Sequence, residues 1–574
     1  MMRKIKITII SLLISISIIG QTEYPAGSPL FPSVSSWYDA AISQSVIDLM
    51  SSLEQPKDQP YQFAIPLMVS LNPSNAGFIL RKEGETVWVM PVFSKGALSL
   101  NAILEPFNLP QGAYVYIYDV NHEIIRGAFI NRSGNDSGIL PVLPVPGDKM
   151  VIECHFPGKN IPSNAIGVRQ ISHDFAGFFR IAAAKDNYYG RSGACEVDLN
   201  CSTNENYLNS SRSVCRLLIM GSELCSGILV NNTGQEYKPY VLTAQHCIQN
   251  SSDANNTLFV FNYASPWCDG PDLTNLHSIA GSLLRASNQD IDFSVVELSS
   301  FPSLVFKPYF AGWDISLVVP TNTYTIHHPE GDVMKISLDD NPPVSSSYPV
   351  TGYISNGFWR ILRWDLGTTE AGSSGGPLFD QNNRLRGTLT GGAATCANPQ
   401  DDYFAKLSRM FTITTIPSTN LKPWLDPGGT GTTIVNGRDP YAYNMSLSDT
   451  LENIPKNDPG QSDVYSAPEY GYSTGINSDS LIMYAEYVPF TGTGELAWIH
   501  LNMANSSYIT AADSVRVFLW RGGVTPGIVI ASRLVKLQEA RNNFNLEVDF
   551  GRTIMITGPF YVGYRVYYKD QIGS

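Results

Sequence analysis

Short runs of alternating hydrophobic and polar positions recur in two parts of the chain. Three of them, at 86–92, 113–118 and 149–153, lie between about residues 61 and 170, where turn-forming residues such as those at 131–138 separate them. Two more occur at 516–520 and 560–568. Alternation with a period of two is the pattern of a half-buried strand, and this spacing is typical of a β-sandwich. We therefore predict a β-sandwich at about 61–170 and a second β domain at 476–574.

The stretches between these strands differ in composition. Residues 21 to about 60 are rich in Pro and Ser, with one helical-looking patch at 37–53. The region 192–438 holds seven of the eight cysteines, and the polar stretch 439–475 has the composition of a linker. The whole chain has 574 residues, of which 43% are apolar and 16% charged. That length and balance indicate an ordered protein of several domains.

The first twenty residues predict export. Residues 1–6 carry three cations, and 7–20 are apolar or hydroxylic before polar sequence begins. This is the basic and apolar pattern of a secretory signal peptide, and the apolar run is short for a membrane-spanning helix. We predict a signal peptide at 1–20, a secreted protein, and no stable membrane insertion after the signal is removed. An oxidising compartment permits disulfides among the eight cysteines.

Two function classes are disfavoured by what the sequence lacks. The formal net charge is −13 and no block of Lys and Arg occurs, whereas nucleic-acid binding relies on clustered cations that displace counterions. A zinc site would need ligands at spacings such as paired CxxC or HExxH, and neither pattern is present. We expect neither a nucleic-acid partner nor a bound metal.

Two motifs provide a candidate base and nucleophile. The segment 243–247, Thr-Ala-Gln-His-Cys, places His246 at the end of a predicted strand, beside a cysteine that could tether it. The segment 372–377, Gly-Ser-Ser-Gly-Gly-Pro, offers Ser374 as a nucleophile. Gly372 allows a backbone conformation in which its own N–H and that of Ser374 both point at the oxyanion of a tetrahedral intermediate.

A third motif supplies a carboxylate. Asp292 opens the alternating strand at 292–298, and Asp290 is the nearby alternative. We favour Asp292, because the following residues place it inside the strand. A buried aspartate can hold the tautomer of a catalytic histidine and stabilise its imidazolium. The chain order His246, Asp292, Ser374 is that of chymotrypsin-type serine proteases. Together the three motifs predict a Ser-His-Asp triad.

The resemblance extends further than the triad. The region resembles the bacterial lysyl endopeptidases, which are secreted chymotrypsin-like proteases made as preproenzymes. Matching segments lie at 192–201, 227–233, 243–247, 311–314, 326–329, 369–377 and 424–427, and those at 96–101 and 145–148 are similar to the family's propeptide. The resemblance implies a mainly β protein: a pro-region at 21–191 containing the β-sandwich, a chymotrypsin-like double β-barrel at 192–438, and a C-terminal β-sandwich-like domain.

The resemblance also implies a pattern of disulfides. The expected pairs are Cys225–Cys247, Cys195–Cys396 and Cys201–Cys268. Two cysteines, Cys154 and Cys215, are then left over, either free or paired with each other across the boundary between pro-region and protease. The pair His327-His328 belongs to a structural turn in the family, so we assign it no metal. No cofactor is implied.

Specificity rests on one carboxylate. In the family an acidic residue in the primary pocket receives the substrate lysine, and the alignment of 405–407 places it at Asp402, with Asp401 as the alternative. The family's histidine before Gly-Gly is absent here, where 389–392 reads Leu-Thr-Gly-Gly. This departure leaves open whether the pocket accepts arginine besides lysine.

We therefore predict a secreted serine endopeptidase that cleaves after lysine, or after lysine and arginine, in protein or peptide substrates. Its own pro-region would be a further partner, released by cleavage at Lys185 or Arg191. Two alternatives remain: a serine protease with another pocket, such as a glutamyl-specific enzyme, and a surface or adhesion protein with a vestigial protease domain.

Overall fold

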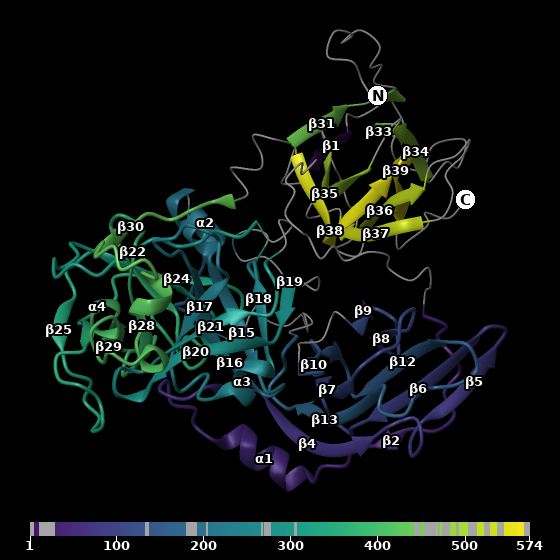
Figure 1. The fold of residues 1–574 in the computed structure, drawn as a ribbon, viewed down its shortest axis with the longest axis horizontal. Coiled ribbons are helices and arrows are strands. Elements are labelled where there is room, and N and C mark those ends of the chain that lie inside the picture. The colour runs from purple at the N-terminus through teal and green to yellow at the C-terminus, as the bar shows by residue number, and fades with distance from the viewer. Residues whose placement is uncertain are drawn as a thin grey trace. The chain divides into compact units, whose positions relative to one another are not determined.

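The computed structural model divides the chain into two compact units, which are described separately. One comprises Ile19–Pro302 and Tyr309–Arg438, and the other Met1–Ile18, Ser303–Pro308 and Asp439–Ser574 (Figure 1). The structure describes residues 5–10, 29–131, 137–179, 192–202, 205–265, 268, 277–302, 307–440, 448–452, 466–467, 471–472, 483–488, 493–502, 514–521, 529–536 and 545–567. In this part of the chain, no helix combines the length and the apolar character needed to cross a membrane.

The first unit begins with a two-layered β-sandwich. One sheet has the order β2-β6-β12-β8-β9, with β5 beside β6, and the other has the order β10-β7-β13-β4, with β11 beside β7. Their strands are β2 (Tyr38–Asp39), β4 (Ala64–Leu71), β5 (Phe78–Lys82), β6 (Glu85–Phe93), β7 (Ser99–Phe107), β8 (Tyr114–Asp119), β9 (Ile125–Phe129), β10 (Leu140–Pro141), β11 (Val145–Pro146), β12 (Lys149–Pro157) and β13 (Ile166–Asp174). A shared core that includes Trp88 and Met90 of β6 and Leu100 and Leu104 of β7 holds the layers together. The predicted sandwich is thus confirmed.

Before the sandwich, the helical-looking patch forms the shorter helix α1 (Gln44–Ser52). The sequence prediction of a helix from residue 37 extends too far, because Tyr38 and Asp39 pair with β6 as the parallel strand β2. After α1 the chain passes residues 53–60 and forms β3 (Tyr61–Gln62), which does not join the sandwich. It pairs with β16 of the following region instead.

That following region consists of two sheets. The first has the order β19-β18-β15-β16-β17-β21-β20, and the second β14-β24-β23-β27-β28-β29-β26-β25, with β22 and β30 alongside β28. The strands are β14 (Val197–Asp198), β15 (Val214–Ile219), β16 (Glu223–Val230), β17 (Tyr240–Thr243), β18 (Thr257–Phe261), β19 (His277–Ala280), β20 (Ser282–Asn288), β21 (Phe293–Leu298), β22 (Trp313–Asp314), β23 (Thr323–His327), β24 (Lys335–Asp339), β25 (Val344–Ser346), β26 (Phe358–Ile361), β27 (Pro377–Asp380), β28 (Leu385–Gly392), β29 (Asp402–Lys406) and β30 (Ile434–Val435).

Both sheets contribute to one core, in which Leu242 and Val295 of the first meet Ile326 and Phe379 of the second. Neighbouring strands are antiparallel except at the β22–β28 pair. Short helices complete the region: α2 (Glu205–Ser211), α3 (Ser251–Asn255), α4 (Leu407–Met410) and α5 (Lys422–Leu425). Two antiparallel β layers around a common core are the architecture expected of the chymotrypsin-like fold, and this fold is confirmed.

The second unit is also a β-sandwich. Its sheets have the orders β31-β1-β35-β38 and β34-β39-β36-β37, beside the small pair β32-β33. The bounds are β1 (Ile5–Ile10), β31 (Ser448–Glu452), β32 (Ser466–Ala467), β33 (Gly471–Tyr472), β34 (Met483–Val488), β35 (Thr493–Asn502), β36 (Ser514–Arg521), β37 (Val529–Lys536), β38 (Asn545–Thr557) and β39 (Phe560–Tyr567). Buried Leu496, Val517 and Val562 join the two sheets in one core.

Two segments of this unit have a predicted role other than that of a strand. β1 is formed by the β-branched run within the predicted signal peptide at 1–20, and β31 to β33 lie within the predicted linker at 439–475. Short β-branched runs satisfy their backbone groups readily by pairing along a sheet. The boundaries that we assigned from the sequence remain predictions.

Candidate active site

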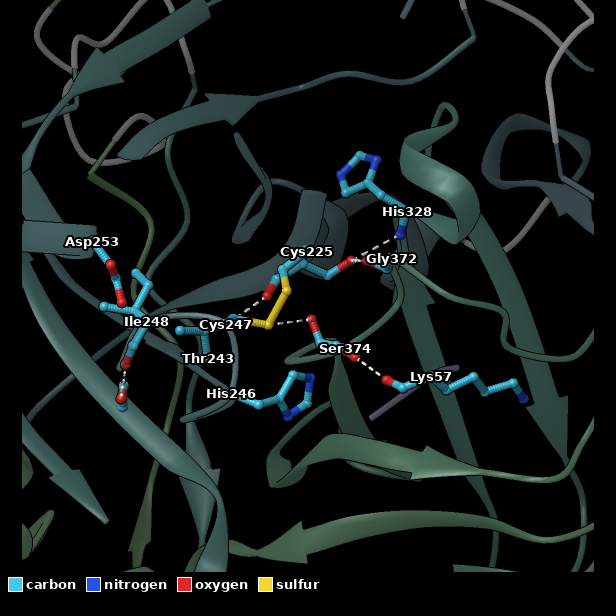
Figure 2. The surroundings of a disulfide bond; sticks show 12 residues. Lys57, Cys225, Thr243, His246, Cys247, Ile248, Asp253, His328, Gly372 and Ser374 are labelled. Carbon is cyan, nitrogen blue, oxygen red and sulfur yellow. Dashed lines mark hydrogen bonds between the residues drawn. A yellow bond between two sulfur atoms is a disulfide. The ribbon is translucent and has the colours of Figure 1, made fainter. Parts of the chain in front are cut away.

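The candidate base is held in place by a disulfide. His246 follows β17, and the next residue, Cys247, is bonded to Cys225 of β16 across 22 positions of sequence. The Cys247 sulfur lies 3.8 Å from the backbone carbonyl oxygen of Ser374. Figure 2 shows the disulfide between the histidine turn and the serine turn. The bond therefore fixes the histidine turn beside the candidate nucleophile.

Asp292 is the carboxylate that the structure brings to His246. The ring nitrogen Nδ1 lies 3.1 Å and 3.0 Å from Oδ1 and Oδ2, and the backbone N–H of His246 donates to Oδ1 at 3.0 Å. Asp292 is 1% exposed, whereas Asp290 is exposed. Burial by itself would raise the pKa of Asp292, but the charge and hydrogen bonds of His246 outweigh it and hold that pKa below its usual value. An ionised Asp292 fixes the Nδ1–H tautomer and leaves Nε2 free to accept a proton.

Ser374 lies in a turn between two glycines with positive φ, Gly372 at +87° and Gly375 at +78°. A side chain at Gly375 would meet Thr243 Oγ1 at 2.2 Å and the Ser226 carbonyl oxygen at 2.4 Å. The turn is pinned by the Ser226 N–H, which donates to the Ser374 carbonyl at 2.8 Å. The backbone N–H groups of Gly372 and Ser374, the predicted oxyanion donors, belong to this turn. Glycine is needed here because the turn packs directly against backbone.

Ser226 is a supporting residue that the sequence reasoning missed. Its hydroxyl donates to the Gly372 carbonyl at 3.0 Å and accepts the backbone N–H of His328 at 3.0 Å. It comes directly after Cys225, so its position beside the disulfide was the available signal. Through these bonds it links the nucleophile turn to the turn that follows β23.

Among the described residues, the hydrogen bond between Ser374 and His246 that the predicted triad requires is not made. The Ser374 hydroxyl donates to the backbone carbonyl oxygen of Lys57, and Nε2 of His246 has no hydrogen-bond partner among the described residues. Lys57 lies in the N-terminal region, between α1 and β3. Figure 2 shows its carbonyl beside Ser374 and its side chain extending away from His246.

Asp402, the predicted pocket residue, is a buried carboxylate. It opens β29 and is 0% exposed. One oxygen, Oδ2, accepts the indole N–H of Trp364 at 2.7 Å and the hydroxyl of Thr369 at 2.8 Å. The other oxygen, Oδ1, lies 3.0 Å from the ammonium of Lys57. A buried carboxylate held by two donors, with its second oxygen toward a cation, is a site for a basic side chain.

The alternative carboxylate lies elsewhere. Asp401 is 36% exposed and pairs with Arg360 at 2.6 Å on the surface. Its φ of +73° turns the chain so that only Asp402 points inward. The sequence reasoning identified Asp402 but missed Trp364, Thr369 and Lys57. A search for lysines in the N-terminal region, prompted by the expected specificity, would have found the segment Gln-Pro-Lys-Asp at 55–58.

The remaining cysteines and the pair His327-His328 are accounted for by disulfides, burial and hydrogen bonds within the protein. The structure contains the three disulfides implied by the resemblance, and Cys154 and Cys215 are free and buried, which rules out the suggested bond between them. His327 contacts the hydroxyls of Ser373 at 2.8 Å and Ser337 at 3.1 Å. The Nδ1 of His328 donates to the Asp332 carbonyl at 2.8 Å.

The start of the predicted mature chain is tied to this core. The backbone N–H of Ser192 donates to Asp332 at 3.3 Å, and that of Gly193 donates to Glu370 at 3.0 Å. The predicted processing residues Lys185 and Arg191 lie outside the described residues.

Comparison with known proteins shows which proteins the chain is similar to. The sequence model of the family described as "Lysyl endopeptidase, C-terminal domain" matches residues 189–405. The chain is similar to the lysyl endopeptidase of Pseudomonas aeruginosa, with 27% identity over 356 residues that cover 57% of this chain and 74% of that protein. It is also similar to the secreted RxLR effector protein 73 of Plasmopara viticola, with 25% identity over 291 residues, 48% of this chain and 69% of that protein.

Among solved structures, the chain is similar to the active form of the Rv3671c protease from M. tuberculosis, with 16% identity, a TM-score of 0.27, and coverage of 40% of this chain and 93% of that one. The MamO protease domain from Magnetospirillum magneticum has 12% identity, a TM-score of 0.26, and coverage of 37% and 100%. Residues 189–405 are thus similar to the C-terminal domain of the lysyl endopeptidases.

Proposed function

We propose that this protein is a secreted serine endopeptidase that hydrolyses peptide bonds on the carboxyl side of lysine. The observation that carries the proposal is the buried Asp402, which faces the ammonium of Lys57 3.0 Å away while the Lys57 backbone carbonyl accepts the hydroxyl of Ser374. An unpaired buried charge is costly, so such a pocket favours a cation and disfavours apolar or acidic side chains. A glutamyl-specific enzyme would need the opposite charge there.

The chemistry follows from the residues in place. Ser374 attacks the carbonyl carbon of the residue whose side chain fills the pocket, and Nε2 of His246 takes the hydroxyl proton and returns it to the leaving amine. Asp292 holds His246 in the required tautomer and stabilises the imidazolium. The backbone N–H groups of Gly372 and Ser374 stabilise the oxyanion. Each of these groups is supplied by the chain itself.

Two further observations support a secreted protein. The structure has three disulfides, which persist in oxidising compartments. The first twenty residues carry the signal-peptide pattern, and the relative from Plasmopara viticola is described as secreted.

The proposal is tested by digestion of a denatured, unrelated protein, with the cleaved bonds identified by mass spectrometry. A Ser374→Ala variant is the matched control. Cuts confined to the carboxyl side of lysine, and missing with the variant, would establish both the nucleophile and the pocket. Cuts after lysine and arginine would keep the mechanism and widen the specificity. Absence of Ser374-dependent cleavage after removal of the N-terminal region would contradict the proposal and favour a binding protein.

A further inference from the structure

We propose that residues 55–62 are a built-in inhibitor whose Lys57 occupies the primary pocket and whose backbone takes the hydroxyl hydrogen of Ser374 away from His246. The inference rests on the proposed function, because it assigns the pocket of that same site to a segment of this chain. It names a binding partner for the pocket, namely a substrate-like loop contributed in cis.

The side chain of Lys57 is bound as a substrate lysine would be. Its ammonium contacts Asp402 at 3.0 Å and Thr369 at 3.1 Å, and the side chain is only 10% exposed. Lysine is rarely buried unless it is paired, and here the partner is a carboxylate with no exposure of its own. The contact joins residues 345 positions apart, so it is not a by-product of local chain geometry.

The backbone of Lys57 acts on the nucleophile. A carbonyl oxygen can only accept, so the hydrogen of the Ser374 hydroxyl must point at Lys57 and not at Nε2 of His246. That nitrogen is buried without a partner among the described residues. In this arrangement the base cannot take the proton from the hydroxyl, and the nucleophile is not activated.

The same carbonyl is not set up for cleavage. Within the described part of the chain, the backbone N–H groups of Gly372 and Ser374 make no hydrogen bond to the Lys57 oxygen. Without these donors the oxyanion of a tetrahedral intermediate would lack its stabilisation. The segment is therefore held in the pocket as an inhibitor while the bond between Lys57 and Asp58 stays intact.

The inhibitory loop is braced from within and tied to the protease. The side-chain amide of Gln55 donates to the Gln62 carbonyl at 2.8 Å and its oxygen accepts the Gln62 N–H at 2.6 Å, which closes the loop around Lys57. Beyond the pocket, Tyr61 and Gln62 form β3, antiparallel to β16 at Leu224 and Glu223. A loop fixed in its bound shape loses little entropy on binding.

The chain on either side of the sandwich packs against the protease region next to the loop. Tyr61, Phe63 and Phe178 share one buried cluster with Leu218 and Leu224 of the protease region. The buried guanidinium of Arg216 lies 4.2 Å from the ring centre of Phe178 and 3.8 Å from that of Tyr263. Covalent linkage makes binding of the loop intramolecular, and a cut before residue 192 would make it dissociable.

The test measures how fast a small organophosphonate probe labels Ser374 in the intact full-length precursor. The probe reacts with an activated serine and does not depend on lysine recognition. The Lys57→Met variant keeps an apolar stem but loses the ammonium, and Lys95→Met changes an exposed lysine of the same sandwich. The labelling rate is proportional to the fraction of molecules whose site is open. We therefore expect Lys57→Met to label at least about tenfold faster than wild type. Lys95→Met should match wild type.

Equal labelling of wild type, Lys57→Met and Lys95→Met would overturn the proposal. So would a new N-terminus at Asp58 that appears as early as cuts at other lysines, because the loop would then be a substrate. If Lys57→Met fails to fold, Gln55→Ala replaces it in the test. This variant loses the hydrogen bonds to Gln62 and keeps Lys57, and it should also label faster than wild type. If the processed wild-type protein is never labelled, the proposed protease function is wrong, and the proposed inhibitor is wrong with it.

Discussion

The indole N–H of Trp364 donates to Oδ2 of Asp402 at 2.7 Å, and the other oxygen of that carboxylate faces the ammonium of Lys57. Trp364 therefore helps to fix the direction in which Asp402 presents its charge. Thr369 donates to the same oxygen at 2.8 Å, so the carboxylate has two neutral donors behind it.

Replacing Trp364 by Phe should weaken lysine recognition without abolishing the chemistry. Hydrogen bonds to charged groups contribute about 1.5–3 kcal/mol, so kcat/KM for a lysyl amide should fall about tenfold or more. Trp424→Phe, which loses an indole bond to the Pro417 carbonyl, is the matched control and should change kcat/KM little. An equal fall in both variants would show that Trp364 acts only through packing.

Asp402→Asn should remove most of the preference for lysine, whereas Asp401→Asn should not. Removing one partner of a buried ion pair costs about 3–5 kcal/mol, which corresponds to at least about a hundredfold in kcat/KM for lysyl substrates. Asp401 pairs with Arg360 at the surface, where an ion pair contributes about 1 kcal/mol or less. Kinetics on the processed enzyme with lysyl and uncharged amides compare the two. A larger loss of kcat/KM for lysyl substrates in Asp401→Asn would show that Asp401, and not Asp402, binds the substrate lysine.

The sequence prediction of the candidate site rests on short motifs. His246, Asp292 and Ser374 each stand in a local context that determines how the backbone presents them, so their identification needed no knowledge of the tertiary structure. The prediction of Asp402 rests on the alignment of 405–407 with the family. Lys57 was missed, because its role depends on a contact with a residue 345 positions away and no motif marks it among the other lysines of the N-terminal region.

Strand ends were missed for a similar reason. The prediction ended one strand at residue 153, but β12 continues to Pro157. Buried His155 breaks the hydrophobic pattern, yet it is satisfied by the carboxylates of Glu85 at 2.8 Å and Glu153 at 2.6 Å. Polar residues that find partners on neighbouring strands are buried without any signal in hydropathy.

Acid should destabilise the protein partly through His328. Burial, with the nearby charge of Arg216, lowers the pKa of His328 to about 3. Below the ordinary value near 6.5 the unfolded chain binds a proton that the folded protein refuses, so this stability is complete above about pH 6.5 and lost as pH falls toward 3. His328→Asn keeps a donor for the Asp332 carbonyl and removes the titration. Between pH 6 and 4, wild type should lose about 2 kcal/mol more than the variant.

Urea unfolding at the two pH values measures this difference, with Ser374→Ala in both proteins to prevent self-digestion. The neighbouring His327 is present in both and cancels from the comparison. Parallel losses in wild type and His328→Asn would show that His328 is already protonated in the folded protein at pH 6.

Gly375→Ala should inactivate the enzyme by displacing Ser374. The new methyl group would lie 2.4 Å from the Ser226 carbonyl oxygen and 2.9 Å from the Ala244 backbone nitrogen, neither of which can rotate away. Gly429→Ala is the control, because its φ of +61° is also unfavourable for alanine but its Cβ would meet nothing within 4 Å. Both variants bear the cost of positive φ, about 1–3 kcal/mol, so thermal unfolding should show it in each. Only Gly375→Ala should also lose kcat, by about a hundredfold or more, since an error of about 1 Å at a nucleophile has that effect. If the two variants kept equal kcat, the turn around Ser374 would be more compliant than its backbone contacts indicate.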